Sequence, residues 1–325
     1  MTTETTKNEN GLINPVPYPY PAPKLAGTGG WLNSEPFTLE SLKGKVVLID
    51  FWTYSCINCI RTLPYITGWD KKYRDKGLVI IGVHAPEFEF EKKLENVKDA
   101  IARYGIKYPV MLDNNLDTWS NFSNHYWPAH YLIDKKGDVV STHFGEGEYD
   151  VTEHNIRFLL GMSGEGETQK PEARVYDAGQ TPETYLGYAR AENFANENDG
   201  QRDKNANYSF PYFLGADHWA LQGPWRVENE KIVSTGKDAH LRINFTAKKV
   251  FLVLGTATAK PVEAGLTLNG EPVGANAGKD APGGVLKVDG HRLFELINQS
   301  EAKNSLLEIK TDEPGLEAYA FTFGR

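Results

Sequence analysis

Hydrophobic positions along the chain follow two different patterns, which change about halfway. In the first half, the apolar runs at residues 46–52, interrupted only by Asp50, and at 78–83 are typical of strands that are covered on both faces of a sheet. Apolar residues at positions 60, 63 and 66, and again between residues 94 and 104, recur with the spacing of a helix. This alternation of strands and helices predicts an α/β domain.

The second half of the chain has short segments in which apolar and polar residues alternate. The alternation is clear at residues 241–245, and large apolar residues also recur at every second position at 250, 252 and 254 and at 319, 321 and 323. The dipeptides Asn269-Gly270 and Asp289-Gly290 lie between such segments and are typical of hairpin turns. Helical periodicity is nearly absent here. The pattern therefore predicts an all-β sandwich of jelly-roll type.

Composition marks the boundaries between these parts of the 325-residue chain, which is long enough for two domains with separate cores. Proline occupies every second position from 15 to 23, so we expect residues 1–30 to form a flexible, proline-rich N-terminal arm. The prolines favour an extended chain, which would act as a spacer or as a strap across the domain surface. Residues 31–162 make up the predicted α/β domain. A polar stretch with glycines and a closing proline predicts a linker over residues 163–182. Residues 183–325 make up the predicted β-sandwich.

Both cysteines of the chain, Cys56 and Cys59, lie where the apolar run at 46–52 gives way to a helical pattern. The first N–H groups of a helix lack partners and the helix dipole is positive there, so an anion is favoured. A thiolate at Cys56 would be that anion, and thiolate is the reactive species in disulfide exchange. Cys59, one helical turn further on, would then attack the mixed disulfide and release the partner. A zinc site would need two more ligands, and the sequence has no second CxxC and no HxxxH.

Asp50 stands six residues before Cys56, inside the same apolar run. Its neighbours Ile49, Phe51 and Trp52 favour burial, whereas the alternative is a surface carboxylate at the end of a strand. A buried carboxylate would suit a general base for Cys59 during the exchange.

These residues resemble the active site of thioredoxin-fold oxidoreductases. Pro64 stands eight residues after Cys56, where thioredoxins kink the same helix, and Trp127-Pro128 precedes an apolar strand, where the family has its cis-proline. The insertion between residues 83 and 113 resembles the TlpA/ResA-like branch. The runs at 126–129 and 144–147 extend the similarity to the C-terminal, extracytoplasmic part of DipZ-type proteins. In those proteins a thioredoxin-like domain precedes a β-sandwich that looks like a carbohydrate-binding module.

The resemblance implies roles for several residues. Asp50 would help to deprotonate Cys59, and Glu87 matches an acidic residue that ResA-like proteins place below the cysteines, although a solvated loop carboxylate is an equal alternative. Pro128 would be cis and, with Trp127, would dock the backbone of a protein substrate as a short added strand. Trp52 belongs to the same expected substrate-binding surface. The redox-active disulfide Cys56–Cys59 would be the redox group itself, with no bound cofactor and no metal.

The implied activity is that of a thiol–disulfide oxidoreductase that acts on protein disulfides outside the cytoplasm, as in the periplasm. Ile57 and Asn58 carry no charge, which favours a reductant because positive residues or histidine between the cysteines make a stronger oxidant. DipZ-type proteins carry a membrane domain before this part. Either a preceding segment is missing from this chain, or electrons come from a separate membrane protein.

Charge and hydropathy limit the alternatives. The net charge of −8 argues against a general nucleic-acid binder. No apolar run approaches the ~20 residues needed to cross a bilayer, and residues 1–11 are polar and lack the apolar core of an export signal. The two cysteines share one motif and leave none for a structural disulfide, which is compatible with any compartment.

A second hypothesis makes the protein a binding module. In it the β-sandwich grips a glycan or a partner protein, and the thioredoxin-like domain is a scaffold or a redox sensor. Six aromatic residues prompt this hypothesis: Tyr208, Phe210, Tyr212, Phe213, Trp219 and Trp225. They would form a sugar-stacking platform or, as we favour, pack in the core and between domains, because aromatic side chains bury large areas.

Overall fold

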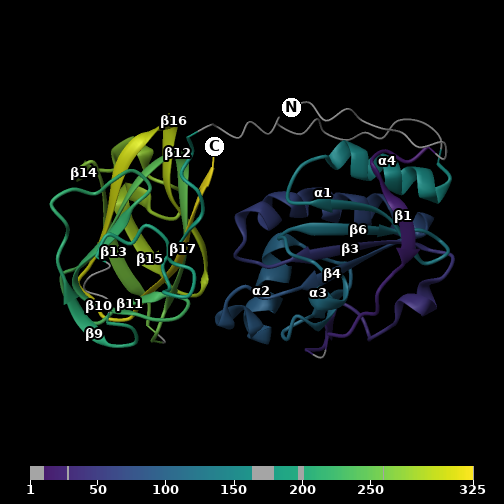
Figure 1. Cartoon of the computed structure of the whole chain (residues 1–325), viewed down its shortest axis with the longest axis horizontal. Helices are drawn as coiled ribbons and strands as arrows, with labels where there is room; N and C mark the ends of the chain where they lie inside the picture. The colour runs from purple at the N-terminus through teal and green to yellow at the C-terminus, as the bar shows by residue number, and fades with distance from the viewer. Residues whose placement is uncertain (1–10, 28, 163–178, 197–200, 259, 325) are drawn as a thin grey trace. The chain divides into compact units, whose positions relative to one another are not determined.

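The structure is a computed structural model of the whole chain, and it describes residues 11–27, 29–162, 179–196, 201–258 and 260–324. Two compact units divide the chain, Met1–Arg174 and Val175–Arg325. Figure 1 shows helices and strands together in the first unit and mainly strands in the second. An α/β domain followed by an all-β domain is therefore confirmed.

Within the described part of the first unit, seven strands form one sheet in the order β1-β7-β6-β3-β4-β5-β2. These strands are β1 (Pro15–Pro21), β2 (Trp31–Leu32), β3 (Val46–Trp52), β4 (Leu78–His84), β5 (Val110–Leu112), β6 (Ala129–Ile133) and β7 (Asp138–Phe144). The helices are α1 (Ile57–Tyr73), α2 (Leu94–Tyr104), α3 (Asp117–Asn121) and α4 (Tyr149–Leu160), with short 3₁₀ helices η1 (Leu39–Leu42), η2 (Arg74–Lys76) and η3 (Glu89–Lys92). Figure 1 shows α1 and α4 on one face of the sheet and α2 and α3 on the other.

Strand β3 lies at the centre of this sheet, and all seven of its residues are buried. It pairs in parallel with β4 from Val46↔Leu78 to Trp52↔His84, and antiparallel with β6. Ile49 and Phe51 belong to the apolar core on one face. Because successive side chains of a strand point to opposite faces, Asp50 points to the other face. Asp50 is therefore the one carboxylate of β3, and it lies inside the domain.

The N-terminal arm differs from the expectation. Residues 1–10 lie outside the described residues, but Pro15–Pro21 forms the edge strand β1, antiparallel to β7. This stretch is therefore part of the sheet and not a flexible arm. Alternating prolines fit an edge strand because an edge leaves one side of the strand without partners, so the missing N–H groups are not required.

The second unit is built from antiparallel strands. They are β8 (Thr184–Tyr185), β9 (Asn205–Tyr208), β10 (Trp219–Val227), β11 (Ile232–Ser234), β12 (Ala239–Thr256), β13 (Val262–Leu268), β14 (Glu271–Pro272), β15 (Val285–Val288), β16 (Arg292–Thr311) and β17 (Leu316–Gly324), with 3₁₀ helices η5 (Gly274–Asn276) and η6 (Pro282–Gly284). The first part of β12 pairs with β10 and its last part pairs with β17, while β16 follows it along most of its length. The strands β10 and β11 complete a circuit back to β17, which is consistent with a β-sandwich.

The six aromatic residues singled out above divide into two groups. Three are fully buried in the core of the second unit: Tyr208, Trp219 and Trp225. The other three, Phe210, Tyr212 and Phe213, line a cavity of about 300 Å³ together with polar side chains that include Arg242, Asn244 and Asn304. Core packing is confirmed for the first group. A glycan site at the second group stays a prediction.

The predicted linker at 163–182 lies largely outside the described residues, which resume at residue 179. Thr181 already belongs to the second unit, because its N–H donates to Thr246 O at 3.0 Å and its hydroxyl donates to Asp217 Oδ1 at 2.6 Å. Within the described ranges, we find no helix with the length and apolar character needed to cross a membrane.

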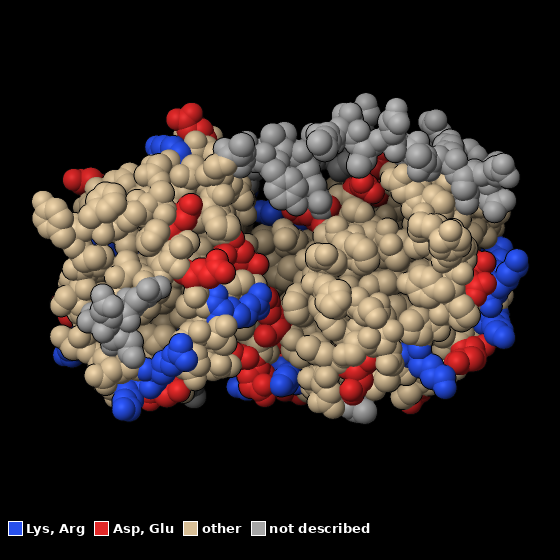
Figure 2. All heavy atoms as spheres, viewed as in Figure 1, with Lys and Arg blue, Asp and Glu red and all other residues tan. Residues whose placement is uncertain are grey.

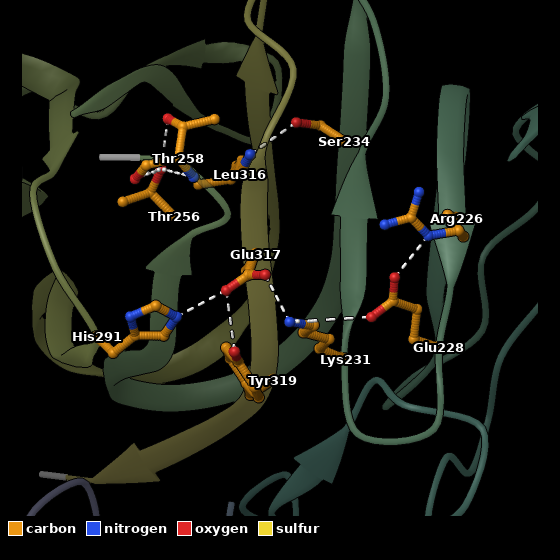
Figure 3. Close-up of polar contacts among 10 residues, drawn as sticks. All are labelled: Arg226, Glu228, Lys231, Ser234, Thr256, Thr258, His291, Leu316, Glu317 and Tyr319. Atoms are coloured by element: carbon orange, nitrogen blue, oxygen red, sulfur yellow. Dashed lines mark hydrogen bonds and ion pairs between the residues drawn. The ribbon is translucent and has the colours of Figure 1, made fainter. Parts of the chain in front are cut away.

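Glu317 of β17 is a buried carboxylate that joins three segments of the second unit (Figure 3). It accepts hydrogen bonds from Lys231 Nζ at 2.5 Å, from His291 Nε2 at 2.7 Å and from the hydroxyl of Tyr319 at 3.0 Å. Burial alone would raise the pKa of Glu317, but the bonds from His291 and Lys231 outweigh it and hold the pKa at about 2. The carboxylate is therefore ionised and fully paired.

Candidate active site

Cys56 and Cys59 lie at the N-terminal end of α1, as the sequence predicts. Strand β3 ends at Trp52, and Cys56 is the residue that caps the helix. The Sγ of Cys56 accepts a hydrogen bond from the backbone N–H of Cys59 at 3.3 Å. Since the first N–H groups of a helix lack intrahelical partners and carry partial positive charge, this position favours negative charge on the sulfur.

The two sulfurs differ in their access to solvent. Both are free thiols, and Cys56 is half-buried whereas Cys59 is only 1% exposed. Desolvation is the main reason that the pKa of Cys59 is raised well above its ordinary value, and the hydrogen bond with Cys56 and the charges of Cys56 and Asp50 add to the increase. Cys59 is therefore protonated at neutral pH and needs a base before it can attack a disulfide.

Asp50 is 1% exposed, so its expected burial is confirmed. Its Oδ1 lies 3.3 Å from Nε2 of His130, which stands opposite it on β6. Tyr108 is also close: burial is the main cause of its raised pKa, and the charge of Asp50 adds to it. Asp50 thus lies in a closed environment with a histidine, a tyrosine and the inner cysteine.

Glu91 is a buried acid that the sequence analysis did not identify. It is 0% exposed, and its Oε1 accepts a hydrogen bond from the hydroxyl of Ser55 at 2.6 Å. Desolvation raises the pKa of Glu91 to about 7, although the hydrogen bonds it accepts oppose this effect. Because Ser55 directly precedes Cys56, Glu91 fixes the backbone on which the outer sulfur stands.

The assignment of the inner acid to Glu87 needs correction. Glu87 is half-buried, and its backbone N–H donates to Oε2 of Glu91 at 2.6 Å. The acid buried beside the cysteine loop is therefore Glu91. In the irregular segment before α2, neither the period of a strand nor that of a helix decides which of the neighbouring glutamates points inward.

The loop before β6 has the backbone form expected for this class of site, because the Trp127–Pro128 peptide bond is cis. Trp127 is half-buried, and its indole N–H donates to Ala85 O at 2.9 Å. The carbonyl of Pro128 accepts a hydrogen bond from Gly145 N at 2.7 Å. The loop is therefore held on both sides, by the segment after β4 and by the end of β7.

Trp52 does not belong to the surface that a substrate can reach, which corrects the expectation. The side chain has no exposed area, and its ring packs edge-on against His84 with the centroids 5.3 Å apart. A Cβ atom on Gly82 would come within 3.0 Å of the Trp52 indole nitrogen, so the neighbouring strand is shaped around this ring. Trp52 packs inside the domain.

Two family models match the chain. Residues 21–160 match the model described as "Redoxin", and residues 181–324 match the model described as "Thioredoxin like C-terminal domain". These ranges follow the two units of the structure.

Relatives among characterised proteins decide the family. The Thiol-disulfide oxidoreductase YkuV of Bacillus subtilis is 36% identical over 141 residues, which cover 94% of its length and 43% of this chain. The chain belongs to the TlpA/ResA-like thiol–disulfide oxidoreductases. This finding confirms the resemblance that the CxxC motif and its surroundings indicate.

The similarity to Protein DipZ of Mycobacterium tuberculosis covers both units. The two sequences are 40% identical over 319 residues, which cover 93% of this chain and 43% of that protein. The chain therefore spans less than half the length of this relative. Among solved structures, the solution structure of a thioredoxin-like protein in its oxidized form is 31% identical, with a TM-score of 0.41 over 45% of this chain and 98% of its own.

Proposed function

We propose that the protein exchanges thiols and disulfides with other proteins through Cys56 and Cys59. The observation that carries this proposal is the pairing of a half-exposed sulfur at the cap of α1 with a buried, protonated sulfur one turn further on. The outer sulfur can reach a partner, and the inner sulfur stays protected until a mixed disulfide has formed.

In this reaction the Cys56 thiolate attacks one sulfur of a substrate disulfide. The bond between the two substrate sulfurs breaks, a mixed disulfide forms at Cys56, and the second substrate sulfur leaves as a thiolate. Cys59 then loses its proton and attacks Sγ of Cys56. The Cys56–Cys59 bond forms and the first substrate sulfur leaves, so two electrons have passed from the protein to its substrate.

We infer that the substrate is an extended peptide segment that lies along the loop with Trp127 and Pro128. Two exposed aromatic rings support this placement. Tyr126 is 53% exposed and Phe144 is 44% exposed, and their centroids lie 5.0 Å apart beside the loop. Apolar residues that flank a substrate cysteine would pack against these rings, while backbone pairing at the loop would set the direction of the peptide.

We propose that the protein works as a reductant outside the cytoplasm and receives electrons from a membrane protein. The uncharged Ile57-Asn58 pair and the similarity to DipZ over most of the chain support this direction. Figure 2 shows Lys and Arg side chains mixed with Asp and Glu on the visible face, and no broad basic patch among its described residues. Such a surface suits protein partners better than nucleic acid.

The direction of electron flow predicts the reduction potential of the Cys56–Cys59 pair. We expect a value near the roughly −270 mV that is typical of thioredoxin-type reductants. Equilibration of the full chain with glutathione buffers, followed by thiol alkylation and mass spectrometry, measures it. A value near about −120 mV would instead make the protein an oxidant.

A trapping experiment tests the exchange itself. We expect C59S, mixed with an excess of insulin, to accumulate a covalent adduct that dithiothreitol releases, because the mixed disulfide at Cys56 then has no partner to resolve it. The adduct is read on a non-reducing gel and identified by mass.

The matched variant C56S retains only the buried sulfur and should form no adduct. Wild type should form little, because Cys59 resolves the intermediate. Equal adduct in both variants, or none in C59S, would contradict the proposed function.

A further inference from the structure

A row of ionisable side chains crosses the sheet of the first unit beside the cysteines. Asp50 of β3 stands opposite His130 of β6, and His130 stands opposite His143 of β7. All three occupy the same level on three neighbouring strands, so their side chains lie on one face. The row leads from the central strand toward the edge of the sheet.

The first two members of this row are buried and poorly satisfied. Asp50 is 1% exposed and His130 is 2% exposed. Asp50 Oδ1 lies 3.3 Å from His130 Nε2, and neither side chain has a hydrogen-bond partner among the described residues. Buried polar groups in folded proteins are almost always hydrogen-bonded, so this pair calls for an explanation in function.

The outer end of the row reaches solvent. The imidazole rings of His130 and His143 lie nearly parallel, at 23°, with their centroids 6.0 Å apart. His143 Nδ1 lies 3.4 Å from Oε2 of Glu148, whose side chain is 47% exposed. The row therefore links the closed environment around Cys59 to a carboxylate on the surface.

We propose that His130 and His143 form a proton path between Asp50 and solvent that serves the resolving step at Cys59. This inference rests on the proposed function and deepens it. Both histidines are positioning residues, because neither touches a sulfur. A neutral imidazole has one nitrogen that accepts and one that donates, so it can take a proton on one side and release one on the other.

Each proton and electron of the resolving step has a defined source and destination. When Cys59 attacks the mixed disulfide, its sulfur gives its proton to the Asp50 carboxylate and its electrons to the new bond with Cys56. Asp50 passes the proton to His130. His130 and His143 share no direct hydrogen bond, so the proton crosses between their rings through a bridging water, and His143 releases it at Glu148. The leaving substrate sulfur takes up a proton from solvent. In the reverse reaction the path runs inward.

Other ionisable groups surround this path and are part of its electrostatics. Cys59 of α1 and Tyr108 before β5 face Asp50. The charge of Asp70 of α1 also raises the pKa of Tyr108. At the outer end, Glu148 precedes α4, and the ion pair of Arg61 with Glu146 lies in the neighbouring segment. Among these described groups, His130 is the residue whose ring approaches Asp50 to ion-pair distance.

A reagent that reports both chemical steps tests the path. Equimolar dithiobis(nitrobenzoate) releases one coloured thiolate when Cys56 attacks it and a second when Cys59 closes the disulfide. Stopped-flow absorbance of the full reduced chain at several pH values therefore separates the two phases. H130Q should leave the first phase unchanged and slow the second roughly tenfold at neutral pH, which is less than the ~10²-fold that loss of a positioned base costs.

The pH profile and the solvent isotope effect separate a proton path from a structural role. In H130Q the second phase should depend more steeply on pH and show a larger slowing in D₂O than wild type, because proton transfer then limits the step. The matched control H154Q removes a histidine of α4 that bonds to Gly11 O, and both phases should match wild type. Equal second phases in H130Q and wild type at every pH would overturn the path.

Two further measurements keep the test decisive. H143Q alters a side chain that is 15% exposed, and it should slow the second phase in the same direction as H130Q, but less. If H130Q does not fold, H143Q carries the test alone, and equal second phases in H143Q and wild type at every pH would overturn the path. Absence of a second phase in wild type would instead refute the proposed function, since the cysteine pair would not close.

Discussion

Asparagine in place of Asp50 is expected to slow closure of the Cys56–Cys59 bond by about 100-fold at neutral pH, with attack by Cys56 unchanged. Burial, the hydrogen bond with Cys56 and nearby negative charge keep Cys59 protonated, so its thiol is a poor nucleophile until a base removes the proton. Asparagine keeps the size of Asp50 but cannot accept that proton. The second phase of thionitrobenzoate release measures the change directly.

The control for this prediction is D75N, which neutralises an exposed carboxylate near the end of α1 and should leave both phases unchanged. If the path through His130 acts in series with Asp50, D50N/H130Q should be no slower than D50N alone. A second phase in D50N within twofold of wild type would contradict the role of Asp50 as the base.

The central strand and the cysteine site are the parts that the sequence predicts well. An apolar run of this length is typical of a strand whose two faces are covered, and β3 is buried along its whole length. The position of Cys56 at the start of a helix follows from the change of period after Trp52. The reactivity of the two cysteines can be predicted from the sequence because it depends on features within a few residues, namely the spacing of Cys56 and Cys59 and the start of the helix.

Burial of particular side chains is harder to predict, because it depends on what the fold packs against them. Trp52 lies close to the cysteines in the sequence, which predicts that it contributes to the substrate-binding surface. In the structure its side chain is buried and packs against His84 of β4. Likewise, the alternating prolines of the arm favour an extended chain, and only the free edge of β7 makes that chain a strand.

The residues that the sequence analysis missed owe their place to contacts between distant segments. His130 meets Asp50 because β6 pairs antiparallel with β3, and that register is not visible in either strand alone. A histidine inside the apolar run at 129–133 is the one signal that could have drawn attention to it. Glu91 lies in a segment without a regular period, so its burial follows from the way that the loop closes over Ser55.

Glutamine in place of Glu91 is expected to remove the pH dependence that this one group gives to the stability of the first unit. Burial raises the pKa of Glu91 from an ordinary value of 4.5 to about 7. Between these values the folded chain holds a proton that the unfolded chain has lost, so this group's contribution to stability is full below pH 4.5 and disappears as pH rises through 7. The loss amounts to about 3 kcal/mol of the free energy of unfolding.

Glutamine does not titrate, and its single carbonyl can keep the bond to Ser55. The difference in free energy of unfolding between wild type and E91Q should therefore shift by about 3 kcal/mol in favour of E91Q between pH 4.5 and pH 8. Urea unfolding of the full chain, read by a short pulse of thiol labelling at one common pH, reports this unit alone because both cysteines lie in it. E89Q is the matched control: Glu89 is 73% exposed, and its substitution should leave the difference flat. A difference for E91Q that is equal at both pH values would show that Glu91 ionises as an ordinary surface carboxylate, and the hydrogen bonds from Ser55 and the loop would then outweigh its burial.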